Sequence, residues 1–240
     1  MRIAVIVPTL NEAPNIGELV RRIDSALKRD YQIVIVDDNS TDGTPDKVIA
    51  LQKMYPVELI RRPGKMGLAS AVIDGMRAVN PDAYIVMDAD LSHPPELLPE
   101  IRDALNKYEF VVASRYVPGG GVSGWPIHRR AISRVSCLLA KGLTAIQDRT
   151  SGYFGVRAAL LDGVELSPIG YKIGLECIVK ATQFPHYSWI ELPYIFVDRR
   201  LGRSKLGPGE FIDYLRHLKA LYKHMWITVL VQAKIGTIKT

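Results

Sequence analysis

The feature that most constrains the fold is an alternation of short β-branched runs with amphipathic helical patterns through the first half of the chain. Apolar runs at 3–7, 33–36, 57–60 and 84–87 are separated by helical patterns at 16–27, 48–54 and 68–79, and a further apolar run follows at 110–114. This order predicts a largely parallel α/β sheet flanked by helices. The runs IAVIV and IVIV are apolar at nearly every position, as expected of strands that are covered on both faces.

The chain has 240 residues, 48% of them hydrophobic, which is enough for one large domain with its own core. We expect a catalytic domain over residues 1–208 and a C-terminal amphipathic helix over 209–240. In that helix apolar residues recur at helical spacing among basic ones, namely Phe211, Leu215, Leu218, Tyr222, Met225 and Val229. The pattern fits equally a helix packed on the domain and a helix lying in a membrane interface.

Charge and composition narrow the classes of partner. The net charge of +6 favours anionic partners such as nucleotides or an anionic membrane surface. The basic residues are dispersed and no nucleic-acid module motif occurs, so we expect no nucleic-acid partner. The two cysteines, Cys137 and Cys177, lie in apolar stretches and are expected to be reduced core residues. The N-terminal apolar run is too short for a signal peptide, and no stretch near the C-terminus reaches the ~20 residues that span a bilayer. We therefore expect a peripheral protein on the cytoplasmic side of a membrane.

Polar clusters follow four of the predicted strands. They are Pro8–Glu12, Asp37–Ser40, Asp88–Asp90 and Ser114–Arg115. Because ligands in open α/β sheets bind at the carboxyl ends of the strands, we expect the four clusters to form one site. The carboxylates of Asp88 and Asp90 are hard oxygen ligands that suit Mg²⁺ or Mn²⁺. Two aspartates separated by one residue are by themselves weak evidence for a metal site, since acidic residues also cap turns.

A glycine-rich segment at 117–125, VPGGGVSGW, is expected to hold no regular element and to form a mobile loop beside the site. Trp125 in this segment is a candidate sugar platform, although tryptophans are more often core or interface anchors. His93, directly after the carboxylates, is expected to support them or to begin a helix rather than to bind metal.

Seven motifs occur in order: PTLNE, VDDNSTDGT, GLASA, MDADLSHPPE, ASRYVPGG, TSGYFGVR and DRRLGRSKLG. Together they resemble the family 2 glycosyltransferases, and most closely the dolichyl-phosphate mannosyltransferase branch. The resemblance covers nearly the whole chain up to about Leu206. It implies a GT-A fold, a Mg²⁺ or Mn²⁺ cofactor, and inverting transfer of mannose from GDP-α-mannose to dolichyl or polyprenyl phosphate.

The resemblance also implies roles for individual residues. Donor-binding positions are Pro8, Leu10, Glu12, Val36, Asp38, Asp88, Ala89, Asp90, Ser92, Arg115, Lys172, Arg199 and Lys205. The residues expected to bind the acceptor phosphate are Arg115, Arg129 and Ser133. The expected metal ligands are Asp88 and Asp90. The expected catalytic residues are Asp90, Arg115 and Arg129. Three positions depart from the family: Leu10 replaces a common Tyr, Ala69 a common Gly, and Ser92 a Gln that helps to ligate the metal in some relatives.

A lipid phosphate is already an anion at neutral pH, so this nucleophile needs no strong general base. We therefore expect positively charged groups to carry the catalysis. Arg129 and Ser133 are four residues apart, which places them on one face of a helix. Two alternatives stay open: glucosyl transfer from UDP-glucose to a polyprenyl phosphate or another glycan acceptor, and a non-catalytic nucleotide-sugar-binding scaffold subunit. A separate membrane-anchoring subunit also stays open as a partner.

Overall fold

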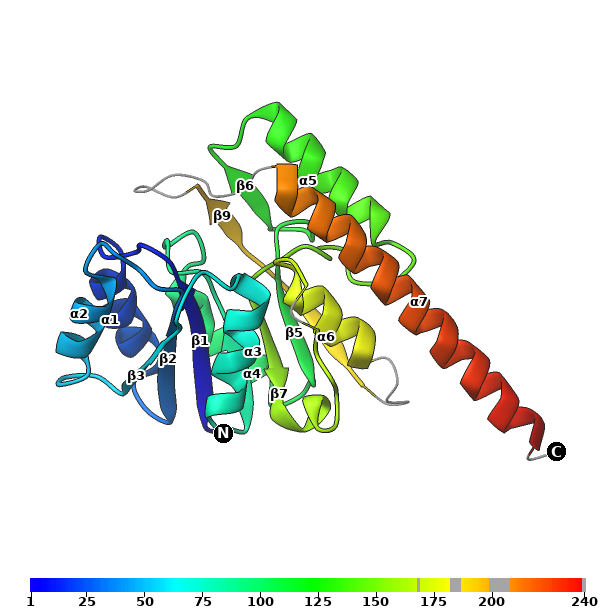
Figure 1. The fold of residues 1–240 in the computed structure, drawn as a ribbon, viewed down its shortest axis with the longest axis horizontal. Coiled ribbons are helices and arrows are strands. Elements are labelled where there is room, and N and C mark those ends of the chain that lie inside the picture. The colour runs from blue at the N-terminus through cyan, green and yellow to red at the C-terminus, as the bar shows by residue number, and fades with distance from the viewer. Residues whose placement is uncertain (168, 182–186, 199–207, 239–240) are drawn as a thin grey trace.

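The sheet predicted from the first half of the chain forms the centre of the molecule. The structure is a computed structural model that describes residues 1–167, 169–181, 187–198 and 208–238. Seven strands lie in the order β3-β2-β1-β4-β7-β5-β8 (Figure 1). The strands are β1 (Ile3–Thr9), β2 (Tyr31–Asp37), β3 (Val57–Arg61), β4 (Ala83–Val86), β5 (Phe110–Ser114), β7 (Phe154–Arg157) and β8 (Trp189–Pro193). The predicted strands are thus all present.

One strand departs from the parallel arrangement. Strand β7 pairs antiparallel with both β4 and β5, whereas β1 is parallel to β2 and β4, and β5 is parallel to β8. Since β7 reverses direction between them, β4 and β5 run the same way. The carboxyl ends of β1, β2, β4 and β5 therefore share one edge of the sheet. From β1 the chain builds the sheet outward through β2 and β3, and it then crosses back to place β4 on the other side of β1. Such a reversal of strand order is the switch point where α/β sheets bind ligands.

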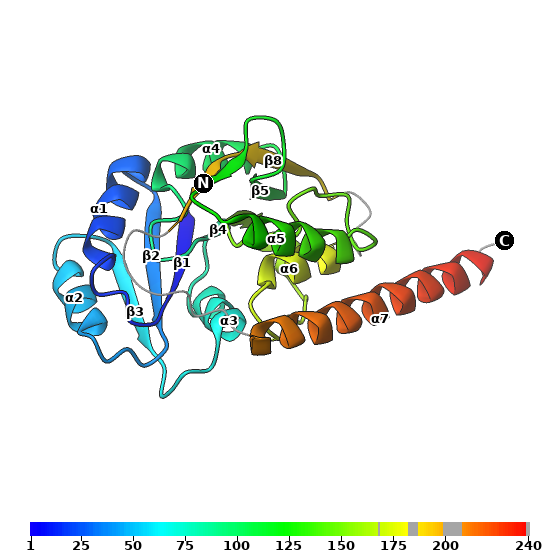
Figure 2. The ribbon, with the colours of Figure 1, turned by 90° about the horizontal axis from the view of Figure 1, so that it is seen from above.

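Helices cover both faces of the sheet (Figure 2). Helices α1 (Ile16–Leu27), α2 (Thr44–Leu51) and α4 (Leu98–Ala104, preceded by the 3-10 turn η1, Pro95–Leu97) pack on one face, and α3 (Leu68–Ala78) and α6 (Ile173–Ala181) pack on the other. A second 3-10 turn, η2 (Ala158–Leu161), follows β7. Successive residues of β1 alternate between the two layers: Val5 packs with α1, and Ile6 packs with α3.

The glycine-rich segment differs from the sequence prediction. Its residues Gly121–Ser123 form strand β6, which pairs parallel with β9 (Ile195–Val197). The expectation of no regular element was therefore wrong, because pairing with a strand more than seventy residues away overrides the local preference of glycine. At Gly120 the backbone passes so close to β5 that a Cβ would lie 2.5 Å from the carbonyl oxygen of Ser114, so no larger residue fits there.

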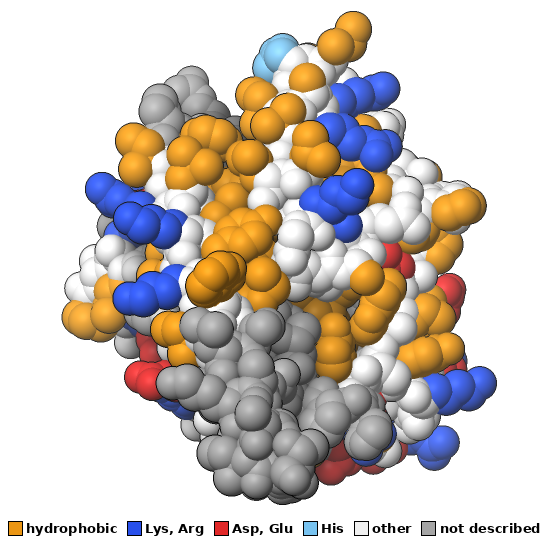
Figure 3. Space-filling model, turned by 90° about the vertical axis from the view of Figure 1, so that its right-hand side faces the viewer, with side chains coloured by type: hydrophobic (Ala, Val, Ile, Leu, Met, Phe, Trp, Pro, Cys, Tyr) orange, Lys and Arg blue, Asp and Glu red, His pale blue; other side chains and the backbone are white. Residues whose placement is uncertain are grey.

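Two further helices lie over one end of the molecule. Helix α5 (Ile127–Leu139) follows the glycine-rich segment, and α7 (Pro208–Ile238) ends the described chain. One side of α7 is buried through Tyr214, Leu218 and Leu221, whereas Phe211 and Leu215, expected on the same face, are exposed. Hydrophobic side chains flanked by Lys and Arg gather on this side of the molecule (Figure 3). In the part of the chain that the structure describes, no helix is both long enough and apolar enough to cross a membrane.

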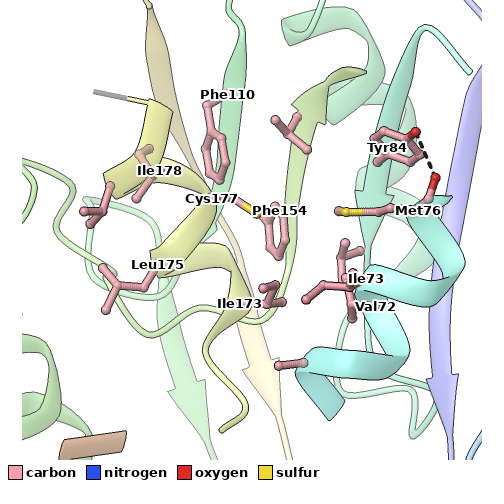
Figure 4. Close-up of a cluster of buried hydrophobic side chains, with 14 of the residues drawn as sticks. Val72, Ile73, Met76, Tyr84, Phe110, Phe154, Ile173, Leu175, Cys177 and Ile178 are labelled. Carbon is pink, nitrogen blue, oxygen red and sulfur yellow. Dashed lines mark hydrogen bonds between the residues drawn. The ribbon is translucent and has the colours of Figure 1, made fainter. Parts of the chain in front are cut away.

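The core beneath α3 and α6 joins the two halves of the sheet (Figure 4). The rings of Phe110 and Phe154 stack with centroids 5.5 Å apart, and Gly174 of α6 lies against Phe154. On the α3 side the hydroxyl of Tyr84 donates to the carbonyl of Met76 at 3.0 Å. This packing of side chains from α3 and α6 against the strands holds the sheet in place, and with it the positions of the strand ends.

Candidate active site

A cavity of about 670 Å³ opens at the edge where β1, β2, β4 and β5 end. Each of the four predicted polar clusters contributes to its wall. The predicted site residues that line it are Pro8, Leu10, Glu12, Asp38, Asp88, Ala89, Asp90, Arg115, Arg129, Ser133 and Lys172. The start of α3, helix α5, the start of α6, strand β9 and the first turns of α7 add further walls, so the cavity lies between the sheet edge and these elements.

Two predicted positions among the described residues, Val36 and Ser92, are not part of this wall. Val36 is fully buried, and its side chain packs against Gly75 of α3. Ser92 is buried as well, and its backbone N–H donates to a carboxylate oxygen of Asp90 at 3.1 Å. Arg199 and Lys205 lie outside the described residues.

The carboxylate pair is held by its surroundings. The backbone N–H of Asp88 donates to Nδ1 of His93 at 3.0 Å, and the His93 ring stacks on Tyr153 with centroids 5.0 Å apart. Burial lowers the pKa of His93, which favours the neutral imidazole that this acceptor role requires. His93 thus fixes the backbone that carries Asp88.

The two aspartates fit a divalent cation completed by a substrate. The Asp88 side chain keeps 39% of its surface exposed and Asp90 is nearly buried, and both line the cavity. Among the described residues, no three or more His, Cys, Asp or Glu side chains are grouped to hold a metal ion. Mg²⁺ is commonly bound by one or two carboxylates together with substrate phosphates and water. Asp88 and Asp90 are the residues that would hold it.

Arg115 is held in the cavity wall by Asp148, a residue that the sequence analysis missed. Its Nε and Nη2 donate to the two carboxylate oxygens of Asp148, each at 2.7 Å, and its backbone N–H donates to the same carboxylate at 2.9 Å. Burial acts to lower the pKa of Arg115, but the hydrogen bonds and charge of Asp148 raise it above its ordinary value. The carboxylate of Glu191 accepts the backbone N–H of Asp148 at 2.9 Å. Asp148 lies just before the TSGYFGVR motif, the only sequence signal that could have indicated it.

Arg129 and Ser133 face the cavity from α5. The guanidinium of Arg129 lies 4.2 Å from the ring centre of Trp125 and forms an ion pair with Asp198 at 2.8 Å. Ser133 accepts a hydrogen bond from the hydroxyl of Tyr116 at 2.7 Å. Trp125 itself is nearly buried, so in this structure its ring supports Arg129.

Lys172 and Asp38 occupy other parts of the wall. The ammonium group of Lys172 donates to the carbonyl of Thr150 at 2.6 Å, and burial together with the charge of Arg115 lowers the pKa of Lys172 to about 8. Asp38 forms an ion pair with the buried Arg62 at 2.7 Å and accepts the backbone N–H of Gly67 at 2.9 Å. Asp38 therefore also fixes the segment before α3, and Arg62 is a second residue that the sequence analysis missed.

Comparison with known proteins identifies the family. The sequence model of Glycosyl transferase family 2 matches residues 4–164. The chain belongs to this family. It is 36% identical to a dolichol-phosphate mannosyltransferase of Saccharomyces cerevisiae, over 91% of this chain and 86% of that protein. It is 40% identical to one of Mycosarcoma maydis, over 94% of this chain and 81% of that protein.

A third relative is longer. The chain is 42% identical to a dolichol-phosphate mannosyltransferase of Pyrococcus furiosus over 93% of its own length, but it spans only 64% of that protein. Among solved structures, glucosyl-3-phosphoglycerate synthase from Mycobacterium tuberculosis, in complex with Mn²⁺ and UDP, gives a TM-score of 0.64 at 20% identity. The match covers 96% of this chain and 79% of that chain. The expected GT-A fold is thereby confirmed.

Proposed function

We propose that this family 2 glycosyltransferase moves mannose from GDP-α-mannose to dolichyl or another polyprenyl phosphate, inverting the anomeric centre. The observation that carries the proposal is the charge arrangement of one cavity, in which Asp88 and Asp90 lie with Arg115, Arg129 and Lys172. Transfer between two phosphate-bearing substrates needs such an arrangement, because two anions must be held together. The relatives named dolichol-phosphate mannosyltransferase support the same reaction.

In this reaction an oxygen of the lipid phosphate attacks the anomeric carbon, and the nucleoside diphosphate leaves. Arg115, Arg129 and Ser133 hold the acceptor phosphate through charge-assisted and hydroxyl hydrogen bonds, and Lys172 contacts the donor diphosphate. Asp88 and Asp90 would hold a divalent cation, which would supply positive charge against the leaving diphosphate. No side chain has to remove a proton from the nucleophile, because the phosphate is already ionised.

The membrane surface is the second partner in this proposal, with the protein peripheral on the cytoplasmic side. Exposed apolar side chains lie on both helices of the end shown in Figure 3: Ile127, Ile132, Val135 and Leu138 on α5, and Phe211, Ile212, Leu215, Trp226 and Ile227 on α7. Exposed basic residues lie on the same helices or just after α5: Arg130, Arg134, Lys141, Arg216, Lys219 and Lys223. An apolar surface with cationic neighbours suits an anionic lipid headgroup layer. Flotation with anionic vesicles tests this part: protein that stays unbound would refute it.

The reaction is tested by transfer of radiolabel from GDP-mannose to a short-chain polyprenyl phosphate, with Mg²⁺, Mn²⁺ or EDTA, and with UDP-glucose in parallel. We expect a cation-dependent mannosyl lipid that Asp90→Ala abolishes. Glucosyl lipid from UDP-glucose instead would favour the alternative donor. Nucleotide-sugar binding without transfer to any acceptor would favour the scaffold alternative.

A further inference from the structure

We infer that Tyr214 and Tyr222 of α7 are positioning residues for α5, the helix that brings Arg129 and Ser133 to the cavity. The inference rests on the proposed function in one respect, namely that α5 holds the acceptor phosphate. It assigns to the first half of α7 a role inside the catalytic unit, in addition to any contact with a membrane.

The contacts lie at the C-terminal end of α5. The hydroxyl of Tyr214 donates to the carbonyl of Ser136 at 2.6 Å, and the hydroxyl of Tyr222 donates to the carbonyl of Leu139 at 2.8 Å. The last four carbonyls of a helix have no partner within the helix. In α5, that of Leu138 accepts the backbone N–H of Lys141 at 3.0 Å, and α7 supplies partners for two of the others.

The chain after α5 leaves room for this approach. Gly142 lies where the Tyr222 hydroxyl comes close, and a Cβ at this position would lie 3.0 Å from the hydroxyl oxygen. A side chain at residue 142 would therefore force the end of the Tyr222 ring to shift by a few tenths of an ångström.

Apart from the contacts of Arg129 with Trp125 and Asp198 and of Ser133 with Tyr116, helix α5 packs little of its surface on the domain. Of its thirteen residues only Ser136 and Cys137 are buried, although its sequence carries several large apolar side chains. Helices in proteins owe most of their stability to a buried apolar face. Because α5 buries so little, the hydrogen bonds from α7 at its end matter more to its position than they would for a well-packed helix.

Helix α7, in contrast, is firmly attached. Tyr214, Leu218, Leu221 and Tyr222 fall at positions i, i+4, i+7 and i+8, the spacing of a helix face that packs on a core, and the first three are buried. The buried Nε2 of His217 lies 3.2 Å from the carboxylate of Glu176 on α6.

That carboxylate also forms an ion pair with Lys180 at 2.7 Å. Helix α6 begins directly after Lys172. Helix α7 thus contacts both α6, which follows Lys172, and α5, which carries Arg129 and Ser133.

The test uses Tyr214→Phe, Tyr222→Phe and the double variant, with Tyr55→Phe as the control on the opposite side of the molecule. Phenylalanine keeps the ring and its packing and removes only the hydroxyl. One net hydrogen bond corresponds to about a fivefold change in an equilibrium. We therefore expect amide hydrogen exchange within residues 127–142 to rise about fivefold for each hydroxyl lost, with exchange in β1 to β4 unchanged.

The kinetic readout separates positioning from general stability. The KM for a short-chain polyprenyl phosphate should rise by a similar factor while the KM for GDP-mannose stays the same. Unchanged exchange over 127–142 in the double variant would overturn the inference, and so would faster exchange with both KM values unaltered. If the unaltered protein makes no mannosyl lipid, the proposed function fails, and the exchange measurement then decides on its own whether α7 holds α5.

Discussion

Replacing Asp148 with asparagine tests whether the Arg115–Asp148 pair is a source of stability as well as a way of orienting a cavity residue. The side chains are 7% and 0% exposed, and the carboxylate accepts two guanidinium bonds at 2.7 Å. Asparagine keeps the shape but removes the charge, so Arg115 becomes a buried cation without a counter-charge. Breaking a buried pair in this way costs about 3–5 kcal/mol, and we expect about 3 kcal/mol because the amide oxygen still accepts one bond.

The assay is urea unfolding, with the free energy of unfolding extrapolated to water. Glu96→Gln is the matched control, because Glu96 binds Arg22 with the same two-point geometry, at 2.8 and 2.6 Å, on the surface. Glu96→Gln should lower the free energy of unfolding by less than about 1 kcal/mol. Mannosyl transfer by folded Asp148→Asn should fall about a hundredfold, since the guanidinium is no longer fixed. Equal destabilisation by the two variants would refute the reasoning.

Two further predictions concern the cavity and the core. With a pKa of about 8 in the unliganded protein, Lys172 loses its charge as pH rises through that value, so kcat/KM for the donor should fall above about pH 8. Lys172→Arg stays charged and should lack this decline; a decline that persists in the variant would assign it to another group. Gly75→Ala should destabilise the protein by about 1–3 kcal/mol, because the new Cβ would lie 2.7 Å from a methyl group of Ile6. Gly17→Ala, in a helix with open space around it, should be neutral or stabilising in the same thermal unfolding measurement.

Most of the fold could be predicted from the first half of the sequence because local periodicity and tertiary packing agree there. The ends of the strands from Ile3 to Ser114 lie within two residues of the predicted ends, and those of α1 and α3 within one, but α2 begins four residues and ends three residues earlier than predicted. The second half was harder, since β7 and β6 gain their strand character from distant partners. No local pattern distinguishes a four-residue antiparallel strand or a glycine-rich one from a loop.

Some residues of the candidate site could likewise be predicted from the sequence and others could not. Carboxylates and cations that follow predicted strands could be placed at one edge from topology alone. Asp148 and Arg62 could not, because they act on cavity residues through side-chain contacts that span many residues of sequence. For α7 the periodicity predicted the helix correctly but its buried face only in part. Tyr214 and His217 are buried, whereas Phe211 and Leu215 are exposed.

The position of β7 has a consequence for how the protein is made. Strands β1 to β4 can pair as soon as they have been synthesised, but β4 and β5 are not neighbours and meet only through β7. Until residue 157 has left the ribosome, β4 has an open edge and β5 lacks a partner. Open edges of apolar strands invite pairing with other chains. Fragments that end between β5 and β7 should therefore aggregate, and the nascent chain passes through a vulnerable interval of about forty residues that ends when β7 enters the sheet.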